Sequence, residues 1–123
     1  MNKSNLVAAA IAARSHAYAP YSRFKVGAAL LAESGEVFTG CNVENISFSL
    51  TLCAERTALV SAIAAGISRF SAIVIVADTT TPISPCGACR QVLAEFAPEL
   101  EILISTLRGP VETHSLADLL PRA

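Results

Sequence analysis

The stretch FSAIVIVAD, residues 70–78, decides the fold, because it is an unbroken run of apolar and β-branched residues around one serine. A run without alternating polar positions is typical of a strand that is covered on both of its faces. Two helical patterns flank it: CAERTALVSAIAAG, residues 53–66, which Gly66 closes, and PCGACRQVLAEFA, residues 85–97. The sequence therefore predicts an α/β protein with helices on both faces of a sheet.

The remaining elements follow outward from this centre. SNLVAAAIAARSHA (4–17) predicts a first helix with Ser4 as N-cap, and KVGAALLA with EVFTGCNVE (25–44, around the turn ESG) predicts a hairpin. LEILIST (100–106) predicts a further strand, and SLADLL (115–120) a short last helix capped by Ser115. The order α-β-β-α-β-α-β predicts a mixed sheet between helices, in a single domain spanning residues 1–123.

The chain carries few charges for its size. Of its 123 residues 53% are hydrophobic and 15% are charged, against about 25% charged in an average soluble domain. We therefore expect part of its surface to be covered by copies of itself. The net charge of −1 and the absence of a Lys/Arg-rich run disfavour nucleic-acid binding. No apolar run is long enough to span a membrane and MNKSNLVAAA lacks a signal-peptide layout, so we expect a cytoplasmic protein without membrane partners.

Three of the four cysteines form a metal-ligand pattern. Cys53 begins one predicted helix, while Cys86 and Cys89 lie in PCGAC at the start of the next. Cys-x-x-Cys can clamp one ion, and three ligands with an open fourth position are typical of catalytic zinc. Helix N-termini also favour thiolates. The alternative for Cys-x-x-Cys is a redox pair, and we interpret Cys41 as a small buried apolar residue.

Glu55 is a carboxylate in a helix that otherwise reads as buried, and desolvating an unpartnered charge is costly. Residues two apart on a regular helix do not share a face, so Cys53 must lie at the helix entry if both are to face one ion. In that position Glu55 is a carboxylate beside the metal without being its ligand. A carboxyl group in a partly dry pocket can hold a proton near neutral pH, as a general acid/base requires.

CAERTA followed by SPCGACRQV strongly resembles the zinc-dependent cytidine deaminases, in particular their short, all-cysteine, homotetrameric class. The resemblance extends from AYAPYSRFKVGAAL through GCNVEN to LADLLP. It implies a three-layer α-β-α sandwich around a mixed five-stranded sheet. It also implies one Zn²⁺ per subunit on Cys53, Cys86 and Cys89, with Glu55 as the proton shuttle. The implied reaction is the hydrolytic deamination of cytidine and 2′-deoxycytidine in pyrimidine salvage, with release of ammonia.

The candidate substrate residues lie in two other segments. Asn42 and Glu44 are two apart at a strand end, so their side chains emerge on one face, where an amide and a carboxylate suit a sugar hydroxyl. The resemblance implies that they bind the ribose 3′-hydroxyl; the alternative is a solvated strand edge. It also implies that Phe24 stacks near the base, whereas composition alone favours core packing. Backbone groups that would read the pyrimidine edge belong to Ala54, Ser84 and Pro85.

Two arginines and one phenylalanine are the remaining candidate site residues. Three thiolates on Zn²⁺ leave a local charge of −1, which a guanidinium hydrogen-bonded to sulfur can offset. Arg56 is our candidate for this role; Arg90 is equally well explained as an ordinary surface or interface residue. Phe48 stands where many members of the resembled family carry tyrosine, and the resemblance implies that it contacts a neighbouring subunit.

Three rival functions remain. A deaminase acting on another amine, such as an aminopyrimidine antibiotic, would keep the zinc and Glu55 but lack the Asn42/Glu44 pair. An enzyme that edits nucleic acid would need a basic, aromatic groove, against which the charge balance argues. A zinc-stabilised module without activity would need a fourth protein ligand, for which His16 and His114 are candidates, although neither is near a cysteine in sequence.

Overall fold

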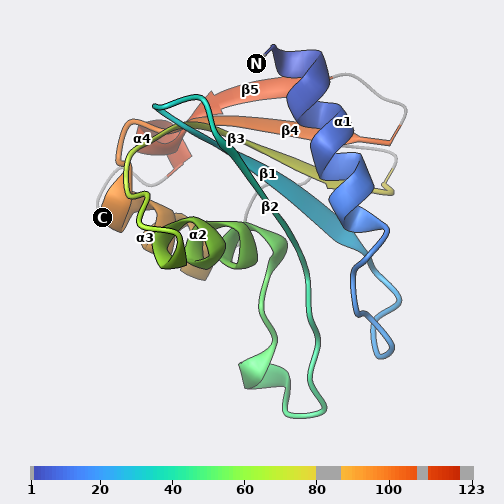
Figure 1. The fold of residues 1–123 in the computed structure, drawn as a ribbon. Helices are drawn as coiled ribbons and strands as arrows, with labels where there is room; N and C mark the ends of the chain where they lie inside the picture. The colour runs from blue at the N-terminus through green and yellow to red at the C-terminus, as the bar shows by residue number, and fades with distance from the viewer. Residues whose placement is uncertain (1, 80–86, 108–110, 120–123) are drawn as a thin grey trace.

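The computed structural model describes residues 2–79, 87–107 and 111–119. Its strands form one mixed sheet in the order β2-β1-β3-β4-β5 (Figure 1). The strands are β1 (Val26–Ala32), β2 (Val37–Cys41), β3 (Phe70–Ala77), β4 (Glu101–Thr106) and β5 (Val111–Ser115). The helices are α1 (Lys3–Arg14), the 3₁₀ turn η1 (Phe48–Leu50), α2 (Ala54–Ala64), α3 (Gly87–Phe96) and α4 (Leu116–Leu119).

Strand pairing confirms a mixed sheet. β1 pairs antiparallel with β2 in the predicted hairpin, whose turn contains Gly35 at φ +99°. β1 also pairs antiparallel with β3, β3 pairs parallel with β4 through α3, and β4 pairs antiparallel with β5. In these registers Val26 lies opposite Ala77 and Ala32 lies opposite Phe70, so the start of β1 and the end of β3 share one end of the sheet.

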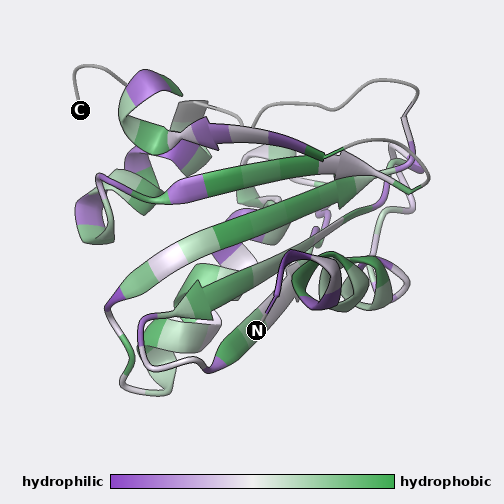
Figure 2. Cartoon of the chain, turned by 90° about the horizontal axis from the view of Figure 1, so that it is seen from above, coloured by the Kyte–Doolittle hydropathy of each residue, from purple (hydrophilic) through white to green (hydrophobic). Residues whose placement is uncertain are grey.

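Helices cover both faces of the sheet, which confirms the three-layer sandwich. On one face α1 packs its buried Leu6 and Ala10 against Val74, Val76 and Leu103. On the other face α2 and α3 pack against Ile73, Ile75, Ile102 and Ile104. Alternate residues of β3 and β4 therefore serve opposite cores, and Figure 2 shows both strands hydrophobic along most of their length. This explains why residues 70–78 lack polar alternation.

Two glycines let the helices approach the sheet closely. A Cβ on Gly27 of β1 would lie 2.0 Å from the carbonyl oxygen of Ala10 in α1. A Cβ on Gly40 of β2 would lie 2.4 Å from the nitrogen of Ala58 and 2.5 Å from the oxygen of Ala54 in α2. Backbone approach at such distances requires glycine. Gly40 thus fixes where the first turn of α2 lies against the sheet.

Two sequence predictions need correction. The first helix begins at Lys3 with Asn2 as N-cap, because Asn2 Oδ1 accepts the N–H of Asn5 at 2.8 Å; Ser4 lies inside the helix. That helix ends at Arg14, not residue 17. The residue patterns predicted four strands and did not include β5 (VETHS). The resemblance implied five strands, and β5 is the fifth. Ser115 does accept the N–H of Ala117, at 3.3 Å, as predicted for the last helix.

Among the helices that the structure describes, none is both long and apolar enough to pass through a bilayer.

Candidate active site

The candidate site is built around the start of α2. Cys53 is the N-cap, in extended conformation, and the helix begins at Ala54, so Cys53 lies at the helix entry as predicted. The side chain of Cys53 makes no capping hydrogen bond at this end of the helix. The first N–H groups of an α-helix have no backbone partner within the helix, and here the N–H of Glu55 bonds the carboxylate of Glu55 itself. Ala54, one of the residues predicted to read the base through its backbone, is fully buried.

Glu55 occupies the first turn of α2 and only 5% of it is exposed. Burial raises the pKa of its carboxyl group above 4.5, and the nearby Cys53 adds to the increase. The N–H of Glu55, a hydrogen bond with Cys89 and the charge of Arg56 act in the opposite direction. Glu55 is therefore a carboxyl group with a raised pKa, next to thiols from two helices.

Cys89 lies in the first turn of α3 and is fully buried. Its interaction with Glu55 places it on the same side as Cys53, so the structure brings together two of the three predicted zinc ligands. The third, Cys86, lies outside the described residues, as do Ser84 and Pro85. Within residues 2–79, 87–107 and 111–119 alone, no three His, Cys, Asp or Glu side chains form a metal-binding group.

Arg56 faces Cys53. Its Nη2 donates to Cys53 Sγ at 3.5 Å and to the carbonyl oxygen of Thr51 at 3.3 Å. The hydrogen bond to Cys53 is the main reason that the pKa of Arg56 is raised, and both cysteines contribute through their charge. Among the described residues, Arg56 Nε is buried without a hydrogen-bond partner. A guanidinium beside thiolates fits a zinc site with more negative than positive charge.

Asn42 and Glu44 lie next to the start of α2, as the pairing of Val43 with Leu52 shows. Asn42 is buried, and its amide holds the chain before β1: Oδ1 accepts the N–H of Val26 at 2.8 Å, and Nδ2 donates to the oxygen of Phe24 at 2.7 Å. An amide has two donors and two acceptor lone pairs. Within the described part of the chain, one donor and one lone pair of the Asn42 amide therefore remain available to a ligand.

Glu44 is also buried and holds the same loop. Its Oε1 accepts the N–H groups of Tyr21 and Ser22 at 3.0 and 3.1 Å, and its Oε2 accepts the hydroxyl of Ser22. The hydroxyl of Ser22 is the first reason that the pKa of Glu44 is lowered from 4.5, and the two N–H groups add to it while burial opposes them. Ser22 was not among the predicted site residues, because a loop serine carries no pattern that reveals its partner.

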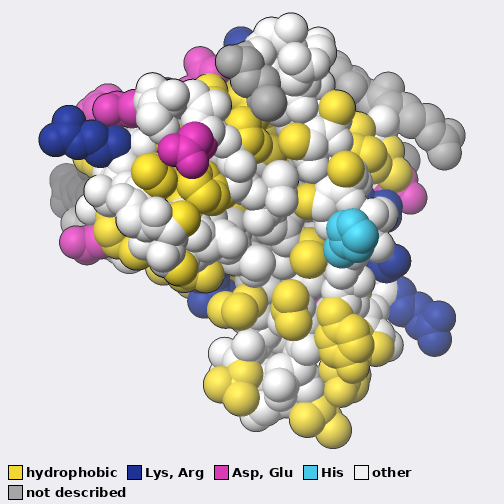
Figure 3. Space-filling model, in the orientation of Figure 1, with side chains coloured by type: hydrophobic (Ala, Val, Ile, Leu, Met, Phe, Trp, Pro, Cys, Tyr) yellow, Lys and Arg dark blue, Asp and Glu magenta, His cyan; other side chains and the backbone are white. Residues whose placement is uncertain are grey.

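Phe24 and Phe48 lie in different surroundings. Phe24 is 38% exposed and lies next to the Asn42 amide. It is therefore not a core residue, which is what composition alone favoured. Phe48 is 80% exposed on η1, within residues 43–52, which we term the arm and which projects away from the sheet (Figure 1). Figure 3 shows hydrophobic side chains over the arm. In the single chain the arm does not bring Phe48 into contact with the core.

Other candidates lie elsewhere. Arg90 donates to the carbonyl oxygen of Leu119 at 2.9 Å and so ties α4 to α3. His114 contacts Glu112 on β5 at 3.1 Å, and His16 is exposed after α1.

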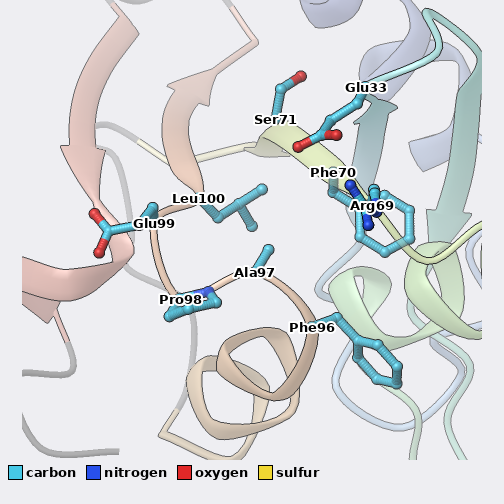
Figure 4. A pocket seen from close by; sticks show the side chains of 9 residues that line it. All are labelled: Glu33, Arg69, Phe70, Ser71, Phe96, Ala97, Pro98, Glu99 and Leu100. Atoms are coloured by element: carbon cyan, nitrogen blue, oxygen red, sulfur yellow. The ribbon is translucent and has the colours of Figure 1, made fainter.

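A cavity of about 460 Å³ lies at the opposite end of the sheet, where β1 ends and β3 begins (Figure 4). Its described lining includes Glu33, Arg69, Phe70 and Phe96 and contains no cysteine, so its chemistry differs from that of the candidate site.

Comparison with known proteins gives consistent matches. The family described as "Cytidine and deoxycytidylate deaminase zinc-binding region" matches residues 1–104. A cytidine deaminase of Sporosarcina psychrophila is 50% identical, with 100% of this chain and 91% of that protein covered. The crystal structure of a cytidine deaminase from Burkholderia pseudomallei superposes with a TM-score of 0.97 at 56% identity, covering 100% of this chain and 99% of that one. That from Mycobacterium tuberculosis gives 0.87 at 44% identity, covering 100% and 97%.

The sandwich, the cysteines at two helix starts and the buried carboxylate define a zinc-binding deaminase domain. The chain belongs to the family of cytidine and deoxycytidylate deaminases. Zinc is the metal of the matched region.

Proposed function

We propose that this chain, as a single catalytic domain, hydrolyses cytidine to uridine and 2′-deoxycytidine to 2′-deoxyuridine, with release of ammonia, in pyrimidine salvage. The observation that carries the proposal is Glu55: a buried carboxyl group with a raised pKa, between Cys53 and Cys89. The matched relatives are named cytidine deaminases over the full length of the chain, which supports cytidine as the substrate. We also propose a cytoplasmic location, where thiols stay reduced.

Cys53, Cys86 and Cys89 would hold one Zn²⁺ per subunit. When bound, zinc supplies a Lewis acid that makes water a nucleophile near neutral pH. Arg56 offsets the surplus negative charge of three thiolates through its bond to Cys53 Sγ. The thiol character of the two described ligands, and the cation beside them, fit zinc better than the oxygen-binding cations Mg²⁺ and Ca²⁺.

Glu55 performs the proton transfers. It accepts a proton from the attacking water and delivers one to ring N3 as C4 is attacked, which relieves the resistance of the aromatic ring to addition. It then takes the remaining proton of the hydroxyl added at C4 and delivers it to the amine as the C4–N bond breaks and the C4=O bond forms, so one water is consumed and one ammonia released. Its raised pKa suits both directions, because the carboxyl group can hold and release a proton closer to the working pH.

The loop and the strand end recognise the nucleoside. We propose that Phe24 stacks near the base, that Asn42 and Glu44 bind the 3′-hydroxyl, and that backbone groups of Ala54, Ser84 and Pro85 read the pyrimidine edge. The available donor and lone pair on Asn42 support this role, since a sugar hydroxyl both donates and accepts.

We further propose that the active unit is a homotetramer in which Phe48 contacts a neighbouring subunit. Two exposed apolar regions support this: the arm, and the outer face of α2 at Val60 and Ala64. Val60 and Ala64 are uncharged, and the one charged residue of the arm, Glu44, is buried and hydrogen-bonded to Tyr21 and Ser22. A second copy of the chain would cover both without unpaired charges.

The test is direct. The purified protein should bind one zinc per chain and remove the ultraviolet absorbance of cytidine while releasing ammonia. Changing Cys53, Cys86 or Cys89 singly to alanine should remove zinc and activity together. Cys41→Ala is the control and should keep both. A zinc-loaded protein without cytidine turnover would refute the function, and a Cys41 variant that alone loses its zinc would refute the ligand set.

A further inference from the structure

Ser22 is the point at which the two halves of the proposed substrate site meet. Its hydroxyl oxygen, Oγ, donates to Glu44 Oε2 and accepts the N–H of Phe24 at 3.0 Å. Its own N–H donates to Glu44 Oε1 at 3.1 Å. One residue therefore bonds both the carboxylate proposed to bind the sugar and the backbone of the aromatic residue proposed to stack on the base.

The backbone at this point adopts an unfavourable conformation. Arg23, between Ser22 and Phe24, has φ +58°, which is uncommon for a residue with a side chain. Such a conformation persists only where the surrounding contacts impose it. Two described bonds do so: the N–H of Arg23 donates to the oxygen of Ala19 at 3.0 Å, and the N–H of Phe24 donates to Ser22 Oγ. The direction in which Phe24 leaves the loop thus depends on the Ser22 hydroxyl.

The same hydroxyl determines how much of Glu44 remains for a ligand. An ionised carboxylate offers about four acceptor positions. The N–H groups of Tyr21 and Ser22 occupy both on Oε1, and the hydroxyl of Ser22 occupies one on Oε2. Among the residues that the structure describes, no further group occupies the remaining position on Oε2, and its direction is set by where the Ser22 hydroxyl lies.

We propose that Ser22 is a positioning residue that holds the Glu44 carboxylate and the Phe24 ring in register, and so sets the affinity for the sugar of the nucleoside. The inference rests on the proposed function, in which Glu44 and Phe24 are the substrate contacts. Ser22 itself is exposed, so replacing it removes a hydroxyl without opening a cavity in the core.

Steady-state kinetics test the proposal. In Ser22→Ala the KM for cytidine should rise about 10- to 100-fold, as expected for the loss of a hydrogen bond to a charged group. The kcat should change by less than about threefold, because Ser22 does not touch the reacting atoms. Ser22→Thr keeps the hydroxyl and should restore the KM. Ser34→Ala is the matched control, since Ser34 also donates to a carboxylate, that of Glu36 at 3.4 Å, but in the β1–β2 turn.

Substrate comparison separates positioning from general loosening. On 3′-deoxycytidine, which lacks the hydroxyl that Glu44 would bind, Ser22→Ala should lose much less efficiency than on cytidine. An unchanged KM, an equal loss on both substrates or a failure of threonine to rescue would each overturn the proposal. Amide hydrogen exchange gives a readout independent of activity: the N–H of Phe24 should exchange faster in Ser22→Ala. Unchanged exchange refutes the Ser22 role, whereas absent cytidine turnover in the wild-type protein refutes the proposed function.

Discussion

Glu55 is the residue on which the proposed chemistry depends most directly, and it can be tested without disturbing the metal. Glu55→Gln keeps the size and burial of the side chain but can neither accept nor deliver a proton. Assistance by a general acid/base contributes about 10²- to 10⁴-fold per step, so kcat should fall by at least that factor while zinc stays bound. Metal analysis and kcat should be measured together. Glu33→Gln is the control, because Glu33 is an exposed carboxylate at the far end of the sheet. Near-normal turnover in Glu55→Gln would contradict the mechanism.

The ionisation of Glu44 makes the stability of the folded protein depend on pH. Hydrogen bonds from Ser22 and Tyr21 lower the pKa of Glu44 from 4.5, so its ionised form is favoured in the folded protein. The resulting stability is fully present above pH 4.5, its ordinary value, and is lost as the pH falls through the lowered pKa. Glu44→Gln should remove this contribution. Urea unfolding midpoints on either side of pH 4.5 should therefore change less in the variant than in the wild-type protein. Equal acid sensitivity of both would show that these bonds do not favour the ionised form.

At the scale of single residues, the sequence predicted the chemical role of a side chain better than it predicted that side chain's hydrogen-bond partners. Cys53 at the helix entry and the burial of Glu55 follow from spacing and desolvation, and the structure has both. Asn42 and Glu44 were predicted to face a ligand, yet their side chains also bond the loop before β1 and the first residue of that strand. These partners lie 16 to 23 residues away in the chain, as the bonds to Val26 and Tyr21 show. No local periodicity encodes a contact of that kind.

At the scale of elements, Gly40 determines the position of α2. A methyl group there would meet the backbone of Ala54 and Ala58 at 2.5 and 2.4 Å, and backbone cannot move aside as a flexible side chain can. In Gly40→Ala the start of α2 must shift away from β2, taking Cys53 and Glu55 with it. Overpacking costs about 1–3 kcal/mol of unfolding free energy, and we expect kcat/KM to fall as well. Chemical denaturation and kinetics measure the two effects.

Thr39→Ala is the matched control for that variant, because Thr39 is the exposed neighbour of Gly40 in the same strand. It changes strand propensity without approaching α2, so its activity should stay near that of the wild-type protein. A Gly40→Ala protein as stable and active as Thr39→Ala would mean that the close contact between β2 and α2 does not position the site.

Elements with strong periodicity were predictable, and those held by their neighbours were not. Residues 70–78 predicted β3 because both faces of that strand are buried. β5 has three exposed residues out of five and lies at the sheet edge, so its sequence VETHS lacks an apolar signal; its pairing with β4 makes it a strand. Similarly, Asn2 and Ser4 are both good caps, and the hydrogen bond between Asn2 and Asn5 shows which of them caps α1.

At the scale of the whole molecule, the low charge content and the exposed arm have one physical explanation. In the single chain Ile46 is 85% exposed, Phe48 80% and Leu50 65%. They belong to the arm, residues 43–52, which projects away from the sheet (Figure 1), and Figure 3 shows hydrophobic side chains over this segment. Large apolar side chains gathered on a projecting segment mark a surface that associates with another protein. We propose that a second copy of the chain covers the arm and the outer face of α2.

The final prediction concerns that assembly. Sedimentation or light scattering should give four times the chain mass of 12.8 kDa, and dilution that dissociates the assembly should abolish turnover. Phe48→Ser should shift the distribution to smaller species and lower activity in parallel, because burying a phenylalanine contributes about 1.5–3 kcal/mol. Val111→Ser, at an exposed apolar position on edge strand β5, is the control and should stay assembled. A fully active and stable monomer would refute both the tetramer and the contact assigned to Phe48. An assembled but inactive Phe48 variant would instead place the phenylalanine in the catalytic site of its neighbour, since assembly alone would then be insufficient for turnover.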